Sequence, residues 1–292
     1  MAGSKKSNGG KLTTSEVGAS QHGLFLIDDE TLTDPIVKDK VFCPVVDGRP
    51  KGHGLVPRDY RIYPPQMFSA PPADMPLIPE DEYDARIEAQ ERDKSSLEHI
   101  ETWDPLDQNG QGYCWFYSST GAVMAARALM HLPHVRLSAH AGAWKIKGGR
   151  DEGGWCGLSA KFYRETGCPS VAKWPEQSMA RSHDTPEVWA EAARYRITED
   201  WVDPTRDVYD VQLTMRMIYT LCLVNGPMAW DFNWWGHSVH GGRMVKVEAG
   251  SYGLRPRNSW GRWGDNGTGW ATLRGQKAIP DSAIALMVPI AA

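Results

Sequence analysis

The amino-acid sequence predicts an α+β protein in which a helical half precedes a mainly β half, behind a long N-terminal extension. Apolar residues at helical spacing mark the first half of the domain, whereas the last third has short apolar strands separated by Gly-rich turns. We expect residues 1–100 to form the extension and residues 101–292 to form one two-lobed domain. Its helical lobe spans about 101–200 and its mainly β lobe about 201–292.

Composition excludes several classes of protein. The chain has 292 residues, of which 41% are hydrophobic and 23% are charged, as in a globular protein. A net charge of -4 is too balanced to indicate binding to nucleic acid. The longest apolar run, near Ala283–Ala292, is shorter than the ~20 residues of a membrane span, and the N-terminus lacks the apolar segment of a secretory signal. We therefore expect neither a nucleic-acid partner nor a membrane partner.

The cysteine pattern indicates free thiols. The count is odd and low for a chain of this length, and no two cysteines have the CxxC spacing of a zinc site. We expect no disulfide scaffold and no structural metal, and a reducing compartment. The five cysteines are Cys43, Cys114, Cys156, Cys168 and Cys222.

The extension divides into three parts. Residues 1–24, rich in Ser, Gly, Lys and Thr, are predicted to be a flexible arm. The Pro-rich stretch Asp34–Pro79 favours an extended wrap over helix or central strand. Glu80–Ile100 is acidic and rich in helix formers, which predicts an exposed helix with a solvated face; docking of this helix over the cleft is the less favoured alternative.

Helices and strands of the domain follow from hydrophobic periodicity. The strongest helix signal is Cys114–Leu132, with Pro133 after it. Further helices are expected at residues 158–166, 187–194 and Val211–Val224, and strands at Met228–Phe232, Arg243–Glu248 and Gly269–Leu273.

Three short stretches carry the residue types of nucleophilic catalysis. Cys114 stands where a Gly-rich loop enters the long helix, and the positive end of the helix dipole favours its nucleophilic thiolate form. His237 stands at the start of an expected strand, and Asn258 is followed closely by two tryptophans. A nucleophile, a base and an amide that orients the base are the three parts of an acyl-transfer site.

These stretches resemble the signature blocks of the papain-like cysteine peptidases. Gln108 stands six residues before Cys114, as the oxyanion-hole glutamine does in that family, and Cys114 is followed by an aromatic residue. His237-Ser238-Val239 and Asn258-Ser259-Trp260-Gly261 resemble the family's His and Asn blocks, and the Cys-to-Asn spacing is within the ~130–150 residues expected. The resemblance covers roughly residues 101–275.

The resemblance implies a fold, an activity and a cleft. It implies a helical lobe, a β-barrel-like lobe and peptide-bond hydrolysis by Cys114, His237, Asn258 and Gln108, with a peptide or protein substrate and no cofactor or metal. Trp260 is expected to shield the His–Asn hydrogen bond. The residues expected to line the substrate cleft are Gly112, Gly153, Gly154, Trp155 and Trp260.

Departures from the family pattern affect substrate preference more than chemistry. Gln111 replaces a cysteine that the family usually pairs, so that disulfide cannot form. Tyr113 replaces a small residue before the nucleophile and is expected to crowd the S1 subsite. The Asn258 block is one residue shorter than usual between its two tryptophans.

An assembly role is the alternative to an enzyme. Pro76–Ile87 and Phe232–His237 resemble papain-like proteins of bacteria and their tailed phages. A papain fold with little or no proteolysis would then serve as a structural component, for example of a virion, with residues 1–79 wrapped around a protein partner. The expected location is cytoplasmic or virion-associated.

Two features compete with this assignment of the site. His240 competes with His237 as the base, but side chains alternate along a strand and the sequence context favours His237. The HxxH spacing of this pair and the stretch Asp265–Thr268 superficially resemble metal sites, but neither has a full ligand pattern.

Overall fold

A seven-stranded sheet forms the β lobe of the computed structural model, which describes residues 24–64, 76–197, 201–204 and 210–286. The strand order is β1-β8-β7-β6-β5-β9-β4, and all neighbours are antiparallel except β1 and β8. A separate hairpin pairs β2 with β3. The strands are β1 (Leu26–Ile27), β2 (Val45–Val46), β3 (Arg49–Pro50), β4 (Trp201–Val202), β5 (Met228–Phe232), β6 (His237–Glu248), β7 (Ser251–Arg257), β8 (Thr272–Arg274) and β9 (Ser282–Leu286).

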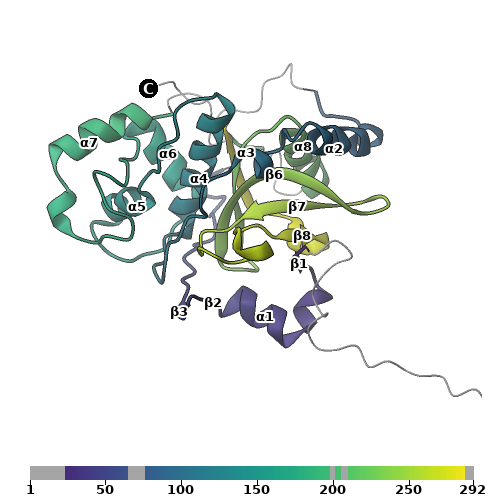
Figure 1. Cartoon of the computed structure of the whole chain (residues 1–292), viewed down its shortest axis with the longest axis horizontal. Coiled ribbons are helices and arrows are strands. Elements are labelled where there is room, and N and C mark those ends of the chain that lie inside the picture. The colour runs from purple at the N-terminus through teal and green to yellow at the C-terminus, as the bar shows by residue number, and fades with distance from the viewer. Residues whose placement is uncertain (1–23, 65–75, 198–200, 205–209, 287–292) are drawn as a thin grey trace, which may run out of the picture.

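Helices gather in a second lobe beside the sheet (Figure 1). This lobe contains α4 (Cys114–Leu129), α5 (Ala139–Lys147), α6 (Cys156–Glu165) and α7 (Pro186–Ala192). The remaining helices, α1 (Pro35–Phe42), α2 (Tyr83–Arg92), α3 (Leu97–Ile100) and α8 (Val211–Leu223), lie around the sheet. Short 3-10 turns are found at Thr31–Thr33, Glu80–Glu82, Arg181–His183, Ala193–Tyr195, Asp265–Gly267 and Gly275–Ala278.

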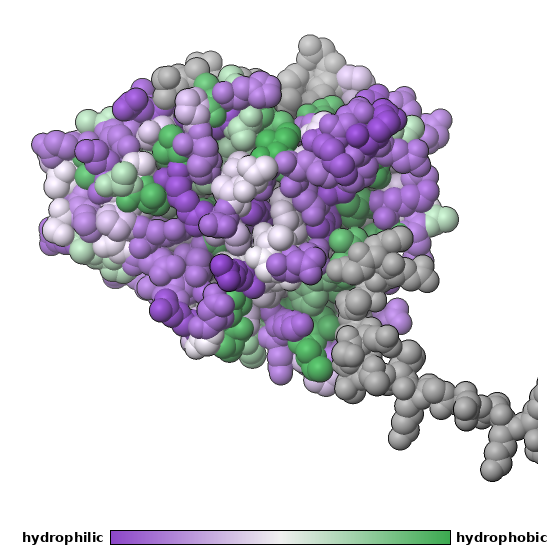
Figure 2. All heavy atoms as spheres, in the orientation of Figure 1, coloured by the Kyte–Doolittle hydropathy of each residue, from purple (hydrophilic) through white to green (hydrophobic). Residues whose placement is uncertain are grey.

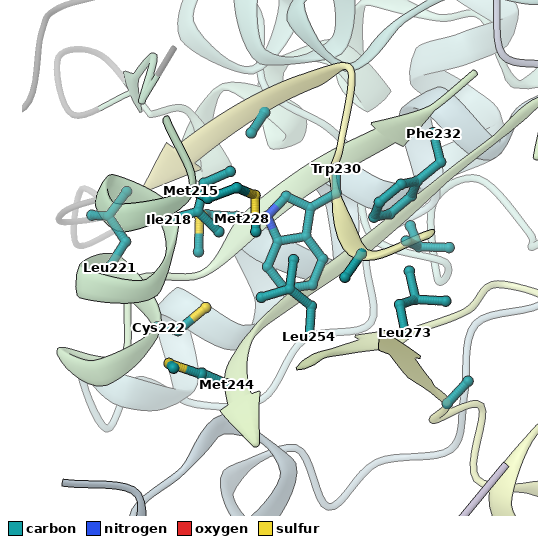
Figure 3. Close-up of a cluster of buried hydrophobic side chains, with 14 of the residues drawn as sticks. Met215, Ile218, Leu221, Cys222, Met228, Trp230, Phe232, Met244, Leu254 and Leu273 are labelled. Carbon is teal, nitrogen blue, oxygen red and sulfur yellow. The ribbon is translucent and has the colours of Figure 1, made fainter. Parts of the chain in front are cut away.

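Two hydrophobic cores meet at strand β5. Met228, Trp230 and Phe232 face the core between the sheet and α8. Figure 3 shows Trp230 among residues of α8, β6 and β7. Ala229 faces the other way, into the core of the helical lobe. This alternation is the period of a strand buried on both sides, and it fixes which side chains of β5 face the other lobe.

Helix α4 joins the two lobes. Every residue from Cys114 to Arg127 is buried, and the helix contacts β5 and β6 on one side and α5 and α6 on the other. The helix ends at Leu129, three residues before the predicted end, because His131 adopts a left-handed φ of 56° that a helix cannot continue. The start of the predicted helix, at Cys114, agrees with the structure.

The prediction of an extended wrap over Asp34–Pro79 is wrong for its first part. Residues Pro35–Phe42 form α1, because Pro35 occupies the first helical turn and the Asp34 side chain accepts hydrogen bonds from the Ile36 and Val37 amides. The indole N–H groups of Trp235 and Trp263 then donate to carbonyls at the end of this helix. The predicted arm, apart from Leu24, and the Pro71-Pro72 pair lie outside the described residues.

The acidic stretch Glu80–Ile100 forms two helices instead of one exposed helix. The break lies at residues 93–96, where Ser96 precedes α3. Tyr83, Ile87 and Leu97 are buried, so one face packs against α8 and β6. The less favoured docking over the cleft is not seen, since α2 contacts these elements instead.

The other predicted elements agree with the structure to within a few residues. Strand β6 includes the predicted range Arg243–Glu248 and starts six residues earlier at His237, the residue expected at the start of a strand. Besides α1, the elements that were not predicted are α5, the two-residue strands β1 to β4, and the strands β7 and β9. Trp201, Trp230 and Trp270 are core residues as expected, and so is Cys222.

The face seen in Figure 2 is mostly hydrophilic, with scattered hydrophobic residues. Among the described residues, no helix has the length and apolar character that a membrane crossing requires.

Candidate active site

Cys114 is the first residue of α4 and is fully buried. Its thiol lies within reach of backbone groups of Gly54, Trp115 and Ser238. The residue before Ser238 is His237, so the start of α4 and the start of β6 meet at the thiol. Backbone N–H groups at a helix start stabilise a thiolate formed there.

His237 and Asn258 are joined by a hydrogen bond between adjacent strands. The His237 Nε2 atom lies 2.8 Å from the Asn258 Oδ1 atom, at the start of β6 and just after β7. Asn258 Oδ1 also accepts from the Ser259 amide at 2.7 Å, which fixes the side-chain amide. The second ring nitrogen, His237 Nδ1, is buried and has no hydrogen-bond partner among the described residues. One ring nitrogen is therefore held by Asn258, whereas the other has no such partner among the described residues.

Trp260 covers the His–Asn pair. Its ring centroid lies 4.3 Å from that of His237, with the planes 31° apart, and the side chain is fully buried. A buried indole in this position keeps water away from the hydrogen bond to Asn258, where a competing water would weaken it.

Gln108 is attached to the loop that carries Asn258. Its amide N–H donates to the Ser259 carbonyl at 2.9 Å, and its side-chain oxygen accepts from the Ser259 hydroxyl at 2.7 Å. These bonds orient the Nε2 group, which donates to the carbonyls of Gln111 and Gly52 at 2.7 and 2.9 Å. Gln108 is thus linked through Ser259 to the loop of Asn258, and the two carbonyls already occupy its side-chain donor group.

His240 belongs to a different, buried network. Its Nε2 atom lies 2.9 Å from Glu101 Oε2, which also accepts from Arg257 Nη1 at 3.1 Å. The His240 ring packs against Gly121, in the third turn of α4, away from the helix start. It contributes to the interior of the protein and not to the thiol site.

Residues 51–58 of the extension cross the site. Lys51 pairs with Asp107 at 2.9 Å, and the Gly52 carbonyl accepts from the Trp260 indole at 3.0 Å as well as from Gln108. The His53 ring centroid lies 5.4 Å from that of His237. We call residues 51–58 the cleft segment.

The cleft segment continues as a strand against Gly154. The Gly154 amide donates to the Gly54 carbonyl at 2.9 Å, and the Val56 amide donates to the Gly154 carbonyl at 2.8 Å. These bonds form a parallel bridge between Leu55 and Gly154. The segment therefore occupies the Gly153–Gly154 edge at which a substrate is expected to pair.

Gly54 lies directly against Gly112. A Cβ atom added at Gly54 would overlap the Gly112 carbonyl and Cα atoms, so only glycine allows this approach. The Gly112 amide donates to Asp151 Oδ1 at 2.7 Å, which holds the loop before Cys114. Gly112, Gly153 and Gly154 all contact the cleft segment, and their place along a substrate cleft stays a prediction.

Burial shifts the pKa values of the thiol and of the imidazole in opposite directions. Burial raises the pKa of Cys114 to about 12, and nearby backbone hydrogen bonds offset only part of this effect. Burial, together with the adjacent His53, lowers the pKa of His237 well below its usual value, against the effect of the Asn258 hydrogen bond. Both shifts favour the uncharged forms of Cys114 and His237, opposite to the effect of the helix start on the thiol.

Tyr113 and Trp155 are both buried beside the cleft. The Tyr113 hydroxyl donates to the Arg150 carbonyl at 2.8 Å, so the ring extends along the loop before Gly153. Trp155 lies under the Arg58 guanidinium, 4.8 Å from its ring centroid. The crowding of S1 by Tyr113 stays a prediction.

Sequence reasoning missed the cleft segment. The signal was Gly52-His53-Gly54, two glycines that allow close approach of one backbone to another, followed by Arg58.

The described residues contain no group of three or more His, Cys, Asp or Glu side chains arranged to hold a metal ion. All five cysteines are free thiols.

Comparison with known proteins identifies the fold. No model of a protein family matches the chain, and no curated protein is similar to it. Among solved structures, the chain is similar to xylellain, a cysteine protease from Xylella fastidiosa, with a TM-score of 0.55 and 16% identity over 84% of this chain and 99% of that one. It is also similar to digestive procathepsin L 3 of Tenebrio molitor, with a TM-score of 0.51 and 18% identity over 68% of this chain and 69% of that one. The chain therefore has the papain-like fold, an α+β fold of two lobes.

Proposed function

We propose that the chain is a cysteine peptidase whose own cleft segment holds it in a blocked form. The observation that carries this proposal is the arrangement at the start of α4: a thiol, an imidazole held through one nitrogen by Asn258, and a side-chain amide from Gln108. The papain-like fold of the neighbouring solved structures supports the same reading.

The proposed reaction proceeds through an acyl-enzyme. The Cys114 thiolate attacks the peptide carbonyl carbon, and the protonated His237 gives its proton to the leaving amine as the C–N bond breaks. The Cys114 amide and Gln108 Nε2 stabilise the oxyanion; loss of one such donor typically lowers the rate by about 10²–10³. Water, with His237 as base, then hydrolyses the thioester. The chemistry requires no metal or organic cofactor.

The direction of the cleft segment explains why it blocks the site and is not readily cleaved. A substrate would place its residues on the acyl side of the scissile bond along Gly153–Gly154. The cleft segment instead has its later residues there, Leu55 and Val56, and its earlier residue His53 beside His237. The chain thus runs opposite to a substrate, and its carbonyls are not presented to Cys114 in the order that cleavage requires.

An assembly role receives less support. Residues 24–64 bind their own chain through β1, α1 and the cleft segment, which favours a self-blocked enzyme over an arm that wraps a partner. The free thiols are in keeping with a reducing, cytoplasmic location. The substrate class is peptide or protein.

Hydrolysis of a denatured protein tests the proposal. We compare the wild-type chain with Gly54→Ala, which displaces the cleft segment, and with Gly54→Ala combined with Cys114→Ala. The expected result is slow hydrolysis by the wild type, faster hydrolysis by Gly54→Ala and none by the double variant. Equal hydrolysis with and without Cys114, or none in any variant, would contradict a Cys114-dependent peptidase.

A further inference from the structure

A cavity of about 340 Å³ lies between the end of α3, the last turns of α4 and residues 132–135. It is separated from Cys114 by about three turns of α4, so it is distinct from the thiol site. Small-molecule sites in proteins commonly have volumes of about 300–1,000 Å³. We call this space the α3–α4 cavity, and its apolar walls include Ile100, Met124, Leu132 and Val135.

Arg127 brings a cation to the lining of the α3–α4 cavity. The residue is only 6% exposed, and its Nε atom has no hydrogen-bond partner among the described residues. Its guanidinium carbon lies 5.1 Å from the centroid of the Tyr195 ring. Burial lowers the pKa of Arg127, and Tyr195 acts in the opposite direction. A ring face offsets only part of what a buried cation loses when it leaves water.

The place of Arg127 on α4 does not account for its burial. A positive charge in the last turn of a helix is favourable, but the effect requires no burial, and arginine is rarely buried unless it is paired. The other buried arginines of the described residues each form an ion pair with a carboxylate: these are Arg58, Arg255 and Arg257. Arg127 has no such pair among the described residues.

The rest of the lining is aromatic or uncharged. His134 stacks on Trp103, with ring centroids 5.2 Å apart and planes 25° apart. Burial and the nearby Arg136 lower the pKa of His134, so this ring is neutral at pH 7. Arg136 itself pairs with Glu176 at 3.0 Å. The α3–α4 cavity therefore combines one cation without a counterion with aromatic and aliphatic walls.

We propose that the α3–α4 cavity binds a small apolar monocarboxylic acid, a ligand unrelated to the peptide substrate of the thiol site. The carboxylate binds the Arg127 guanidinium, whose planar fork of donors matches two carboxylate oxygens. The hydrocarbon chain displaces water from the apolar walls. A neutral ligand would leave Arg127 without a counterion, and a dianion would bring a second charge that no lining residue balances.

The test is isothermal titration calorimetry of the full chain at pH 7.5 with octanoate as the probe, below the concentration at which octanoate forms micelles. Octanamide is the first comparison, because it has the same chain and nearly the same shape without the charge. Butyrate is the second, because it has the charge and a shorter chain. The site is located with Arg127→Met, and Arg194→Met is the matched control because Arg194 is exposed.

We expect one octanoate per chain with a dissociation constant below about 1 mM. Octanamide and butyrate should each bind at least about tenfold more weakly, since one lacks the charge and the other lacks four methylene groups. Arg127→Met should weaken octanoate binding at least about tenfold and leave octanamide binding nearly unchanged. Arg194→Met should change neither.

If Arg127→Met does not unfold cooperatively in urea, Ala128→Leu replaces it. Ala128 lines the same cavity, so the larger side chain should weaken octanoate and octanamide together. Equal affinities for octanoate and octanamide would overturn the role of Arg127. Octanoate binding that the substitution leaves unchanged would place the ligand elsewhere and overturn the site, and so would a wild-type dissociation constant above about 10 mM.

Discussion

At Gly54 the chain has no side chain where a Cβ atom would overlap the Gly112 backbone. The absence of this atom lets the cleft segment lie on the Cys114 thiol and donate to it from the backbone. The closed state of the site is therefore sensitive to a single methyl group at this position.

We predict that Gly54→Ala opens the site. Overpacking of this kind costs about 1–3 kcal/mol, and about 2 kcal/mol corresponds to an increase of roughly 30-fold in the open population. Alkylation of Cys114 by iodoacetamide at pH 8 should accelerate accordingly. Gly110→Ala is the matched control, because a Cβ atom there meets nothing closer than 3.7 Å. Equal rates in the two variants would contradict a closure that depends on Gly54.

His53 is predicted to make the closure sensitive to acid. Burial lowers the pKa of His53 in the closed state, whereas a released segment has the ordinary value of about 6.5. Above pH 6.5 His53 is neutral in both the closed and the released state. As the pH falls below that value, the released segment binds a proton more readily than the closed one, so the free energy that favours closure decreases. In the closed state burial and the adjacent His53 also lower the pKa of His237, which acts in the same direction.

The measurement is the rate at which Cys114 reacts with 2,2′-dipyridyl disulfide, compared between the wild type and His53→Gln at pH 7.5 and 4.5. Comparison with the variant cancels the pH dependence of the reagent and of the thiol itself. The ratio of wild type to variant should rise at pH 4.5. A ratio that does not change with pH would contradict this role of His53.

At the scale of elements, one buried carboxylate ties the end of α3 to the sheet. Glu101 follows α3 and binds His240 of β6 and Arg257 of β7, and all three side chains are at most 4% exposed. β6 carries His237 and β7 leads into Asn258, so this network fixes the two strands that place the site. Elements far from the thiol thus determine its geometry.

We predict that Glu101→Ala lowers the free energy of unfolding by about 3–5 kcal/mol, because it leaves the buried Arg257 without its carboxylate. Glu82→Ala is the control: its pair with Arg86 is 46% exposed on both sides and should cost less than about 1 kcal/mol. Urea denaturation measures both. Similar small losses of unfolding free energy in both variants would show that the network of Glu101, His240 and Arg257 contributes little to stability.

Local patterns predicted the long elements and failed where capping or distant pairing decided the outcome. The helix Cys114–Leu132 and the strand Met228–Phe232 have strong periodic signals. Helix α1 was missed because the many prolines of Asp34–Pro79 suggested an extended chain, although Pro35 lies where a helix tolerates proline and Asp34 caps the helix. Strand β1 has only two residues and depends on β8, some 245 residues away, for its partner.

For the whole molecule, the sequence predicted the fold and the set of candidate residues but not the state of the site. Cys114, His237 and Asn258 each stand in a recognisable local context, and their order along the chain supported the two-lobed fold. The cleft segment has no such context. Its position depends on bonds between Gly54 and Gly154, about 100 residues apart, and on an ion pair between Arg58 and Asp203. Contacts of that range cannot be read from spacing alone.

A thiol activated by His237 and hidden by the chain's own extension is the central claim for the molecule. The most direct test is the pH dependence of Cys114 alkylation by iodoacetamide, located by mass spectrometry, in the wild type, in Gly54→Ala and in Gly54→Ala with His237→Ala. We predict slow labelling of the wild type, rapid labelling of Gly54→Ala well below the free-thiol pKa of about 8.5, and loss of that low-pH reactivity without His237. A single ordinary thiol titration near pH 8.5 in both Gly54→Ala proteins would contradict it.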